Sequence, residues 1–390
     1  RAPEGFHEVT TIGIHDLAVA TASHVVELDD LAARADIDPA KFRIGLGQEQ
    51  MSIPGLDEDI VTMGAAAAQR IIDRHGVDGI RTLFFATETG IDQSRAAGVH
   101  VHELLGLPRS VRVVELKQAC YSATAALQAA AGLIARNPDE RVLVIASDVA
   151  RYELDTAAEP TQGAGAVAFL VSADPAIAVL ETAAGVYTAE VDDFWRPNDS
   201  VTAVVDGKLS VSAYLDGVAG AWDDYRSRGG VDIDQIDWFC HHQPFTKMAV
   251  KAHRALGQHL GVELDPELVT ATTGYNRRIG NSYTASLYIA LAALLEGEND
   301  LTGSRIGLFS YGSGSVSEFF TLVVQPGYRD ATRGAETEAI LAARTPVDVP
   351  TYRDLHDAAH RDSTVDVTIA PESPGPFHFA GLSARARRHT

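Results

Sequence analysis

The chain has 390 residues, of which 46% are hydrophobic and 22% charged, a balance typical of a folded enzyme with room for two core-bearing units. Its net charge of -21 opposes nonspecific binding to nucleic acid or to an anionic membrane surface. With only two cysteines and no secretion-type leader pattern, the sequence predicts a cytoplasmic protein without a disulfide framework. No apolar stretch reaches the roughly 20 residues that a membrane span needs, so no membrane insertion is expected.

In the first half, alanine-rich helical segments alternate with short β-branched or aromatic runs, a pattern that predicts an α/β layered fold. Helices are expected at residues 60–76 and just after residue 120, and strands at 82–88, 111–117, 141–148 and 166–172. The run GAGAVA at 163–168 matches a dinucleotide-binding pattern, but it leads into the strand-like run VAFLVS where that site needs a helix. We therefore expect no nicotinamide cofactor.

The second half repeats this order of elements. TLFFATETG is echoed by IDWFCHHQP, ACYSATAALQAAAGLIA by GNSYTASLYIALAALLE, and RVLVIASD by RIGLFSYGSG. The sequence predicts an internal duplication, with similar halves at 1–175 and 176–328 and a binding crevice between them. Residues 329–390 are expected to form a C-terminal extension with one or two helices and a short strand, to which we assign no chemistry.

Three reactive side chains are candidates for catalysis. Cys120 lies at the start of an alanine-rich helix, where free N–H groups and the helix dipole lower a thiol pKa from about 8.5, which predicts a nucleophile; the alternative is a small buried hydrophobe. Glu88 follows an apolar strand, so desolvation is expected to raise its pKa toward that of a general base, unless it is only a turn carboxylate. Strand alternation points His242 with Cys240 and opposite to His241, which favours His242 as the site histidine, although a lone histidine here is commonly structural.

Weaker signals surround these three. Asn281 opens a helical segment, either as its cap or as a group that orients a carbonyl, and Ser313 lies between two glycines where backbone N–H groups can approach an oxyanion. Lys247, Lys251 and Arg254 fall on one helix face, which favours either phosphate docking or a solvated surface. The histidine pairs at 100/102 and 356/360 lack a third ligand, so no metal site is expected.

Five motifs occur in order along the chain: ATETGIDQS, ELKQACYSATAAL, HHQPFTKM, GNSYTASLY and FSYGSGS. With them, residues 12–328 resemble the hydroxymethylglutaryl-CoA synthase family of the bacterial type. The resemblance implies the thiolase fold, with two duplicated halves in a five-layer αβαβα arrangement, and commonly a homodimer. It also implies a place in the mevalonate pathway of isoprenoid biosynthesis, with acetyl-CoA and acetoacetyl-CoA as substrates and no further cofactor.

In that family pattern, Cys120 takes the acetyl group from acetyl-CoA, and Glu88 then removes a proton from its methyl carbon. The enolate attacks the ketone of acetoacetyl-CoA, which His242 holds and polarises, and water releases the product from the cysteine. The resemblance assigns supporting roles to further residues: Asn281 assists His242, the N–H groups of Cys120 and Ser313 bind the oxyanion, Tyr152 and Phe194 line the acetyl pocket, and Lys247 and Lys251 meet the CoA phosphates.

Other activities compete with this interpretation. A CoA-primed ketoacyl synthase shares the fold and uses Cys, His and Asn, but it lacks the glutamate that Glu88 supplies. A polyketide β-branching synthase takes its acetyl group from an acyl carrier protein. A Cys-His-Glu hydrolase and an inactive binding scaffold are further alternatives. The chain departs from the family at Gln243, where valine is common, and by the additional thiol of Cys240, which we interpret as core filler.

Overall fold

Nine strands from both halves of the chain form one continuous sheet in the computed structural model, which describes residues 11–358 and 363–390. The strand order is β11-β12-β13-β8-β1-β7-β6-β4-β5. The strands of the first half are β1 (Gly13–Thr21), β4 (Ile80–Ala86), β5 (Arg112–Leu116), β6 (Arg141–Ala150) and β7 (Gly163–Ser172). Those of the second half are β8 (Ala178–Thr188), β11 (Trp238–His241), β12 (Arg305–Gly312) and β13 (Val316–Val324).

The two halves of this sheet repeat one topology. In the first half β1 pairs antiparallel with β7, β7 antiparallel with β6, and β6 parallel with β4. In the second half β8 pairs antiparallel with β13, β13 antiparallel with β12, and β12 parallel with β11. The halves meet where β1 pairs with β8 through Gly13 and Ile14. The repeated order confirms the predicted duplication, with β5 as an additional edge strand of the first half.

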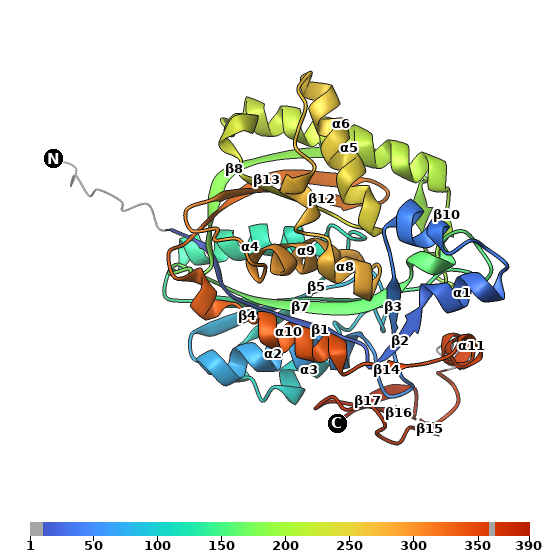
Figure 1. Cartoon of the computed structure of the whole chain (residues 1–390). Coiled ribbons are helices and arrows are strands. Elements are labelled where there is room, and N and C mark those ends of the chain that lie inside the picture. Colours follow the sequence, from blue (N-terminus) through green and yellow to red (C-terminus); the bar gives the residue numbers. More distant parts are fainter. Residues whose placement is uncertain (1–10, 359–362) are drawn as a thin grey trace.

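Helices cover both outer faces of the folded sheet and fill the space between its halves (Figure 1). Outside the second half lie α5 (Gly207–Ser227) and α6 (Thr246–Leu260). Outside the first half lie α2 (Ile60–His75), α3 (Gly98–Leu104) and α10 (Gly334–Ala342). Between the halves lie α4 (Ser122–Arg136), α8 (Gly274–Ile279) and α9 (Ser286–Leu295). This is the five-layer αβαβα arrangement that the family resemblance implies.

Side-chain composition explains why these elements lie where they do. All ten residues of α9 are buried, because SLYIALAALL carries apolar side chains all round the helix and is stable only between two sheets. All ten residues of β7 are also buried, as expected for a strand with helices on both faces. Helix α5 crosses β8 so closely that a Cβ at Gly185 would lie 1.9 Å from the Tyr225 nitrogen, so only glycine fits there.

Shorter elements surround this core. One small sheet joins β14 (Thr345–Pro346) to β2 (His24–Glu27) and β3 (Gln50–Ile53), and another contains β15 (Val367–Thr368), β16 (Phe379–Ser383) and β17 (Ala386–His389). The remaining strands and helices are β9 (Phe194–Trp195), β10 (Val204–Val205), α1 (Leu28–Arg34), α7 (Glu267–Thr270) and α11 (Val349–Ala358). A π-helical turn covers Lys41–Leu46, and 3-10 turns cover Glu159–Thr161, Ile233–Gln235, Tyr283–Ala285 and Tyr328–Ala331.

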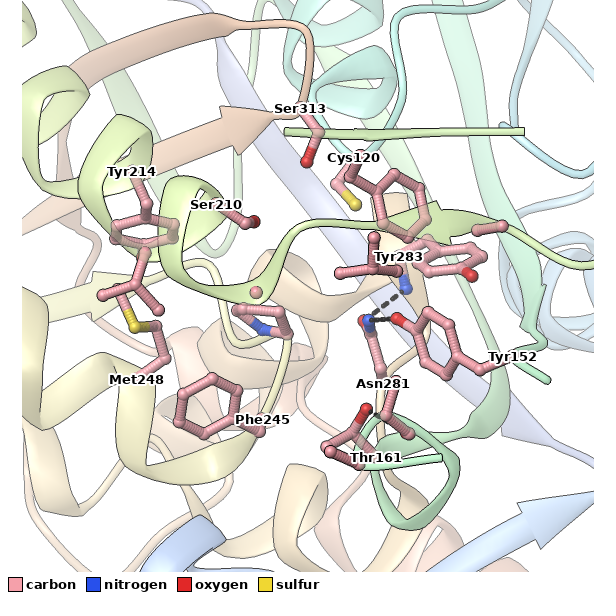
Figure 2. A pocket seen from close by; sticks show the side chains of 18 of the residues that line it. Cys120, Tyr152, Thr161, Ser210, Tyr214, Phe245, Met248, Asn281, Tyr283 and Ser313 are labelled. Carbon is pink, nitrogen blue, oxygen red and sulfur yellow. Dashed lines mark hydrogen bonds between the residues drawn. The ribbon is translucent and has the colours of Figure 1, made fainter. Parts of the chain in front are cut away.

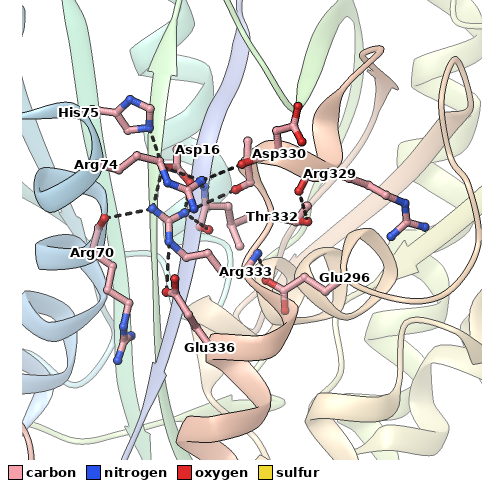
Figure 3. Close-up of polar contacts among 12 residues, drawn as sticks. Asp16, Arg70, Arg74, His75, Glu296, Arg329, Asp330, Thr332, Arg333 and Glu336 are labelled. Atoms are coloured by element: carbon pink, nitrogen blue, oxygen red, sulfur yellow. Dashed lines mark hydrogen bonds and ion pairs between the residues drawn. The ribbon is translucent and has the colours of Figure 1, made fainter.

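A buried ion cluster fastens the C-terminal extension to the first half (Figure 3). The guanidinium of Arg333, just before α10, forms a two-pronged ion pair with Asp16 on β1, with Nη2 2.8 Å from Oδ2. His75 at the end of α2 places Nε2 2.7 Å from the same oxygen. The Arg333 and Asp16 side chains are only 2% and 0% exposed, so solvent screens this pair weakly. The extension therefore packs into the first half of the fold.

Most of the expected elements are present, but the strand β1 is not signalled by the sequence. The helix expected at 60–76 is α2, the four expected strands are β4 to β7, and the run at 163–168 lies inside β7. The hydrophobic pattern of β1 is interrupted by His15 and by Asp16, whose charge is compensated only in the folded chain. The divisions at residues 175 and 328 stay predictions, and His360 lies outside the described residues.

Residues 11–358 and 363–390 contain neither a membrane-spanning helix nor a metal-binding cluster of side chains. Their helices are too short or too polar to cross a lipid bilayer. They also contain no group of three or more His, Cys, Asp or Glu side chains arranged to hold a metal ion.

Candidate active site

Side chains from both halves line a cavity of about 390 Å³ (Figure 2). The predicted site residues among them are Cys120, Tyr152, Phe194, His242, Asn281 and Ser313. Glu88 instead lines a larger neighbouring cavity of about 1280 Å³, which shares Phe194 and Ser313 with the first. The fold thus gathers residues that lie far apart in the sequence.

A tight turn before α4 presents Cys120 to the cavity. Ala119 has a φ of 44°, a left-handed conformation that costs about 1 kcal/mol or more in a residue with a Cβ. The Ser122 hydroxyl holds the turn, because it accepts from the Gln118 N–H at 2.7 Å and donates to the Ala119 carbonyl at 2.8 Å. From the second half, Gly312 lies so close that a Cβ there would be 2.4 Å from the Gln118 carbonyl oxygen. The thiol therefore lies on a turn that both halves restrain.

The Cys120 thiol donates a hydrogen bond to the Glu88 carboxylate, with Sγ 3.1 Å from Oε2. Burial raises the pKa of Glu88, and the nearby Asp148 charge raises it further, in the direction expected of a general base. Burial and the Glu88 charge also raise the pKa of Cys120. The expectation of a lowered thiol pKa is therefore wrong. Desolvation and a facing carboxylate outweigh the dipole of α4, which begins at Ser122.

Asp148, a fully buried carboxylate near the end of β6, holds the segment that carries Glu88. Its Oδ1 accepts from the Glu88 N–H at 3.0 Å and from the hydroxyls of Thr87 and Thr89, each at 2.6 Å. Its Oδ2 accepts from the N–H of Thr284 in the second half at 3.1 Å. Sequence reasoning missed Asp148, although an acidic residue after the apolar run RVLVIAS is the same signal that singled out Glu88.

His242 follows β11 and lines the cavity, as strand alternation predicts. Cys240 packs in the apolar core between the halves, which agrees with its interpretation as filler. His241 stacks on Phe239, with the ring planes 6° apart. Burial lowers the pKa of His242 to about 3, so its ring is neutral at physiological pH. The Tyr214 hydroxyl donates to the His242 carbonyl at 2.7 Å and fixes the backbone there.

Asn281 connects the reactive centre to an aromatic wall (Figure 2). Its Nδ2 donates to the Tyr152 hydroxyl oxygen at 3.1 Å, and its Oδ1 accepts from the Tyr283 N–H at 2.9 Å. The amide thus holds the turn at Tyr283 and orients the Tyr152 ring, while the orientation of a substrate carbonyl stays a prediction. The Tyr152 ring lies edge-on to Phe194, with centroids 6.1 Å apart, and to Tyr283, with centroids 6.3 Å apart.

A buried aspartate shapes the turn that contains Ser313. Asp193 Oδ1 accepts from the Gly314 N–H at 2.9 Å, and its Oδ2 accepts from the Tyr311 hydroxyl at 2.7 Å. The Gln118 amide, next to the nucleophile turn, donates to the Ser313 carbonyl at 3.2 Å. Sequence reasoning did not single out Asp193, whose only signal is its place in the DFWRPN motif.

Lys247, Lys251 and Arg254 are exposed on α6, as their spacing predicts. Lys247 Nζ donates to the Ile44 carbonyl at 2.9 Å. Lys251 Nζ lies 5.2 Å from the ring centroid of Phe245, which itself lines the cavity. In so acidic a chain, these ammonium groups beside the cavity supply a local positive potential for an anionic ligand.

A duplicated five-layer fold with a cysteine and a carboxylate at the centre is typical of thiolase-fold enzymes that form and condense acyl thioesters. Comparison with known proteins agrees with this class. The family models described as hydroxymethylglutaryl-coenzyme A synthase, N terminal and C terminal, match residues 8–176 and, in two segments, 177–260 and 258–349.

Individual relatives match over nearly the whole chain. A hydroxymethylglutaryl-CoA synthase of Enterococcus faecalis is 40% identical over 367 residues, which cover 93% of this chain and 95% of the relative. A polyketide biosynthesis 3-hydroxy-3-methylglutaryl-ACP synthase of Bacillus subtilis is 34% identical over 370 residues, 88% and 87% of the two chains. The solved structure of MvaS in complex with 3-hydroxy-3-methylglutaryl coenzyme A matches with a TM-score of 0.90 and 38% identity, over 97% of this chain and 99% of that chain. The chain belongs to the hydroxymethylglutaryl-CoA synthase family and is an enzyme that catalyses an acyl-transferring condensation.

Proposed function

We propose that the protein condenses acetyl-CoA with acetoacetyl-CoA and water, giving 3-hydroxy-3-methylglutaryl-CoA and CoA through an acetyl group carried on Cys120. The observation that carries the assignment of roles is the 3.1 Å hydrogen bond from Cys120 Sγ to Glu88 Oε2, at a cavity that His242 and Asn281 also line. This reaction belongs to the mevalonate pathway, as the family implies.

In the first half-reaction, the Cys120 sulfur attacks the acetyl carbonyl of acetyl-CoA and gives up its thiol proton. The new carbon–sulfur bond replaces the bond to CoA, whose sulfur leaves and takes up the proton that Cys120 gave up. We assign the oxyanion that forms between these steps to the backbone N–H groups of Cys120 and Ser313, two residues that line the cavity. Burial raises the pKa of Glu88, so its carboxylate is a stronger base than that of an exposed glutamate when it acts on carbon in the second half-reaction.

In the second half-reaction, Glu88 removes a proton from the acetyl methyl group, and the resulting enolate forms a carbon–carbon bond to the ketone carbon of acetoacetyl-CoA. His242 donates a hydrogen bond to the ketone oxygen and stabilises the alkoxide that develops there, and the alkoxide then takes up the proton that Glu88 removed from the methyl group. The lowered pKa of His242 keeps its ring neutral, with one N–H to give and no charge to desolvate. Asn281 supports the same region, and water finally cleaves the thioester to free Cys120.

The rest of the predicted site serves binding. Tyr152 and Phe194 form the wall of the acetyl pocket, which is consistent with their edge-on contact at the cavity. Lys247 and Lys251 meet the CoA phosphates, as their exposed ammonium groups beside the cavity support. A homodimer and a cytoplasmic location complete the proposal.

Omission of the acceptor, acetoacetyl-CoA, tests the function directly. Thiol release from acetyl-CoA is followed with and without acetoacetyl-CoA for the parent, Glu88→Ala, Cys120→Ala and the matched control Cys240→Ala, a thiol outside the cavity. We expect condensation in the parent and in Cys240→Ala, acetylation without condensation in Glu88→Ala, and neither in Cys120→Ala. Hydrolysis of acetyl-CoA alone would replace the proposal with a hydrolase. Acetylation only from an acyl carrier protein would replace it with the β-branching activity named in the Bacillus subtilis relative.

A further inference from the structure

The C-terminal helix α11 (Val349–Ala358) packs against the loop that joins β6 to β7. This loop forms one wall of the 390 Å³ cavity, to which it contributes Tyr152, Glu153, Thr156, Ala157, Ala158 and Thr161. The extension that sequence analysis left without chemistry therefore supports the acyl pocket from behind.

One contact from α11 reaches Tyr152 directly. His356 Nε2 donates a hydrogen bond to the Tyr152 carbonyl oxygen at 3.1 Å. Burial lowers the pKa of His356, so the ring is neutral and carries a single N–H, which this contact places on Nε2. The peptide group that follows Tyr152 is thus held by a side chain of the extension.

A chain of hydrogen bonds that begins on the same helix holds the backbone N–H of Tyr152. The Tyr352 hydroxyl, fully buried, donates to Glu159 Oε1 at 2.9 Å and accepts from Gln162 Nε2 at 2.6 Å. Gln162 Oε1 then accepts from the Tyr152 N–H at 2.9 Å. A carboxylate can only accept, so the Tyr352 hydroxyl must donate its proton to Glu159. Gln162 must then turn its NH₂ group toward the Tyr352 oxygen, which leaves its own oxygen to accept from Tyr152. One hydroxyl therefore decides which way the amide faces.

The ring of Tyr152 transmits this restraint to the reactive centre. Its hydroxyl oxygen accepts from Asn281, and its ring lies edge-on to Phe194 and Tyr283 beside Cys120. A displacement of the Tyr152 backbone would move this wall relative to the acyl group on sulfur.

We propose that α11 is a positioning element for the acyl pocket: Tyr352 and His356 fix both backbone groups of Tyr152 and thereby restrict the donor to a two-carbon acyl group. This inference rests on the proposed function and adds its donor selectivity. Neither Tyr352 nor His356 lines the cavity, so each acts through Tyr152 and not on the substrate.

The test uses the full-length enzyme and compares kcat/KM for acetyl-CoA and propionyl-CoA as donors at fixed acetoacetyl-CoA. Tyr352→Phe removes only the hydroxyl, and His356→Ala removes the direct donor. His356→Gln keeps an amide Nε2–H near the same place as a conservative rescue. Asp354→Asn, an exposed change on the same helix, is the matched control.

We expect Tyr352→Phe and His356→Ala to lower the acetyl-to-propionyl ratio at least fivefold, mainly through KM, while His356→Gln and Asp354→Asn keep the parent ratio. An unchanged ratio in folded variants overturns the inference, because a purely structural role for α11 would lower the melting temperature without altering selectivity. If Tyr352→Phe does not fold, the two His356 variants decide the question alone. A parent that transfers no acetyl group overturns the proposed function itself, a result visible without any variant.

Discussion

The Glu88→Gln substitution should make the Cys120 thiol more reactive while it abolishes condensation. Glutamine keeps an oxygen that accepts the thiol hydrogen bond, so the change removes mainly the negative charge. At 3.1 Å, Coulomb repulsion between that carboxylate and a thiolate is about 1.3 kcal/mol with the dielectric constant of water and about 5 kcal/mol with an effective value near 20. Removing even the smaller repulsion would lower the pKa of Cys120 enough to give a roughly tenfold larger thiolate fraction at a given pH.

Nucleophilicity falls as a thiolate becomes less basic, with a Brønsted coefficient of about 0.4–0.5, so a tenfold gain in thiolate leaves about a threefold gain in rate. The assay is the second-order rate constant for exchange with hydroxyethyl disulfide, with the modified peptide identified by mass. Cys240 is an internal control, because it is fully buried and should stay unmodified in the folded protein.

The pH dependence follows from the same repulsion. Only the ionised carboxylate opposes a thiolate, and the pKa of Glu88 is raised, so the gap between Glu88→Gln and the parent should widen as the pH rises through that pKa. If Glu88→Gln reacts no faster than the parent across this range, the electrostatic explanation of the raised Cys120 pKa is refuted. Faster exchange together with retained condensation would refute Glu88 as the carbon base.

Three further changes test the surrounding structure. Asp148→Asn removes a charge that raises the pKa of Glu88, so the acid limb of the kcat/KM profile should move to lower pH. An acid limb that stays in place or moves to higher pH would contradict this. Gly312→Ala introduces a Cβ 2.4 Å from the nucleophile turn and should slow acetylation more than tenfold, whereas Gly132→Ala on α4, with open space around its Cβ, should leave acetylation unchanged. Arg333→Ala leaves Asp16 buried without its partner and should lower the free energy of unfolding by about 3–5 kcal/mol in urea titrations, and a loss below 1 kcal/mol would show that the cluster is not stabilising.

The layered fold was readable from the sequence because its signals are local. Apolar runs such as LYIALAALL are incompatible with a surface position, and the echo between the two halves is visible in the order of motifs alone. Strand ends also marked Glu88 and His242 as neighbours of a common crevice. The strand β1 escaped detection because Asp16 interrupts its pattern, and the charge that excludes a strand in isolation is neutralised by Arg333 more than 300 positions away.

What the sequence determined by itself is the identity and order of the reactive groups: a thiol before a helix, and a carboxylate and a histidine at strand ends. Only the tertiary structure decided their electrostatics. The helix dipole read from the sequence favours a thiolate, but burial and the Glu88 carboxylate raise the pKa of Cys120 instead. The role of α11 was likewise invisible, since Tyr352 and His356 meet the Tyr152 loop only after folding. Propensity and periodicity report on neighbours along the chain, whereas desolvation, charge proximity and hydrogen-bond relays depend on neighbours in space.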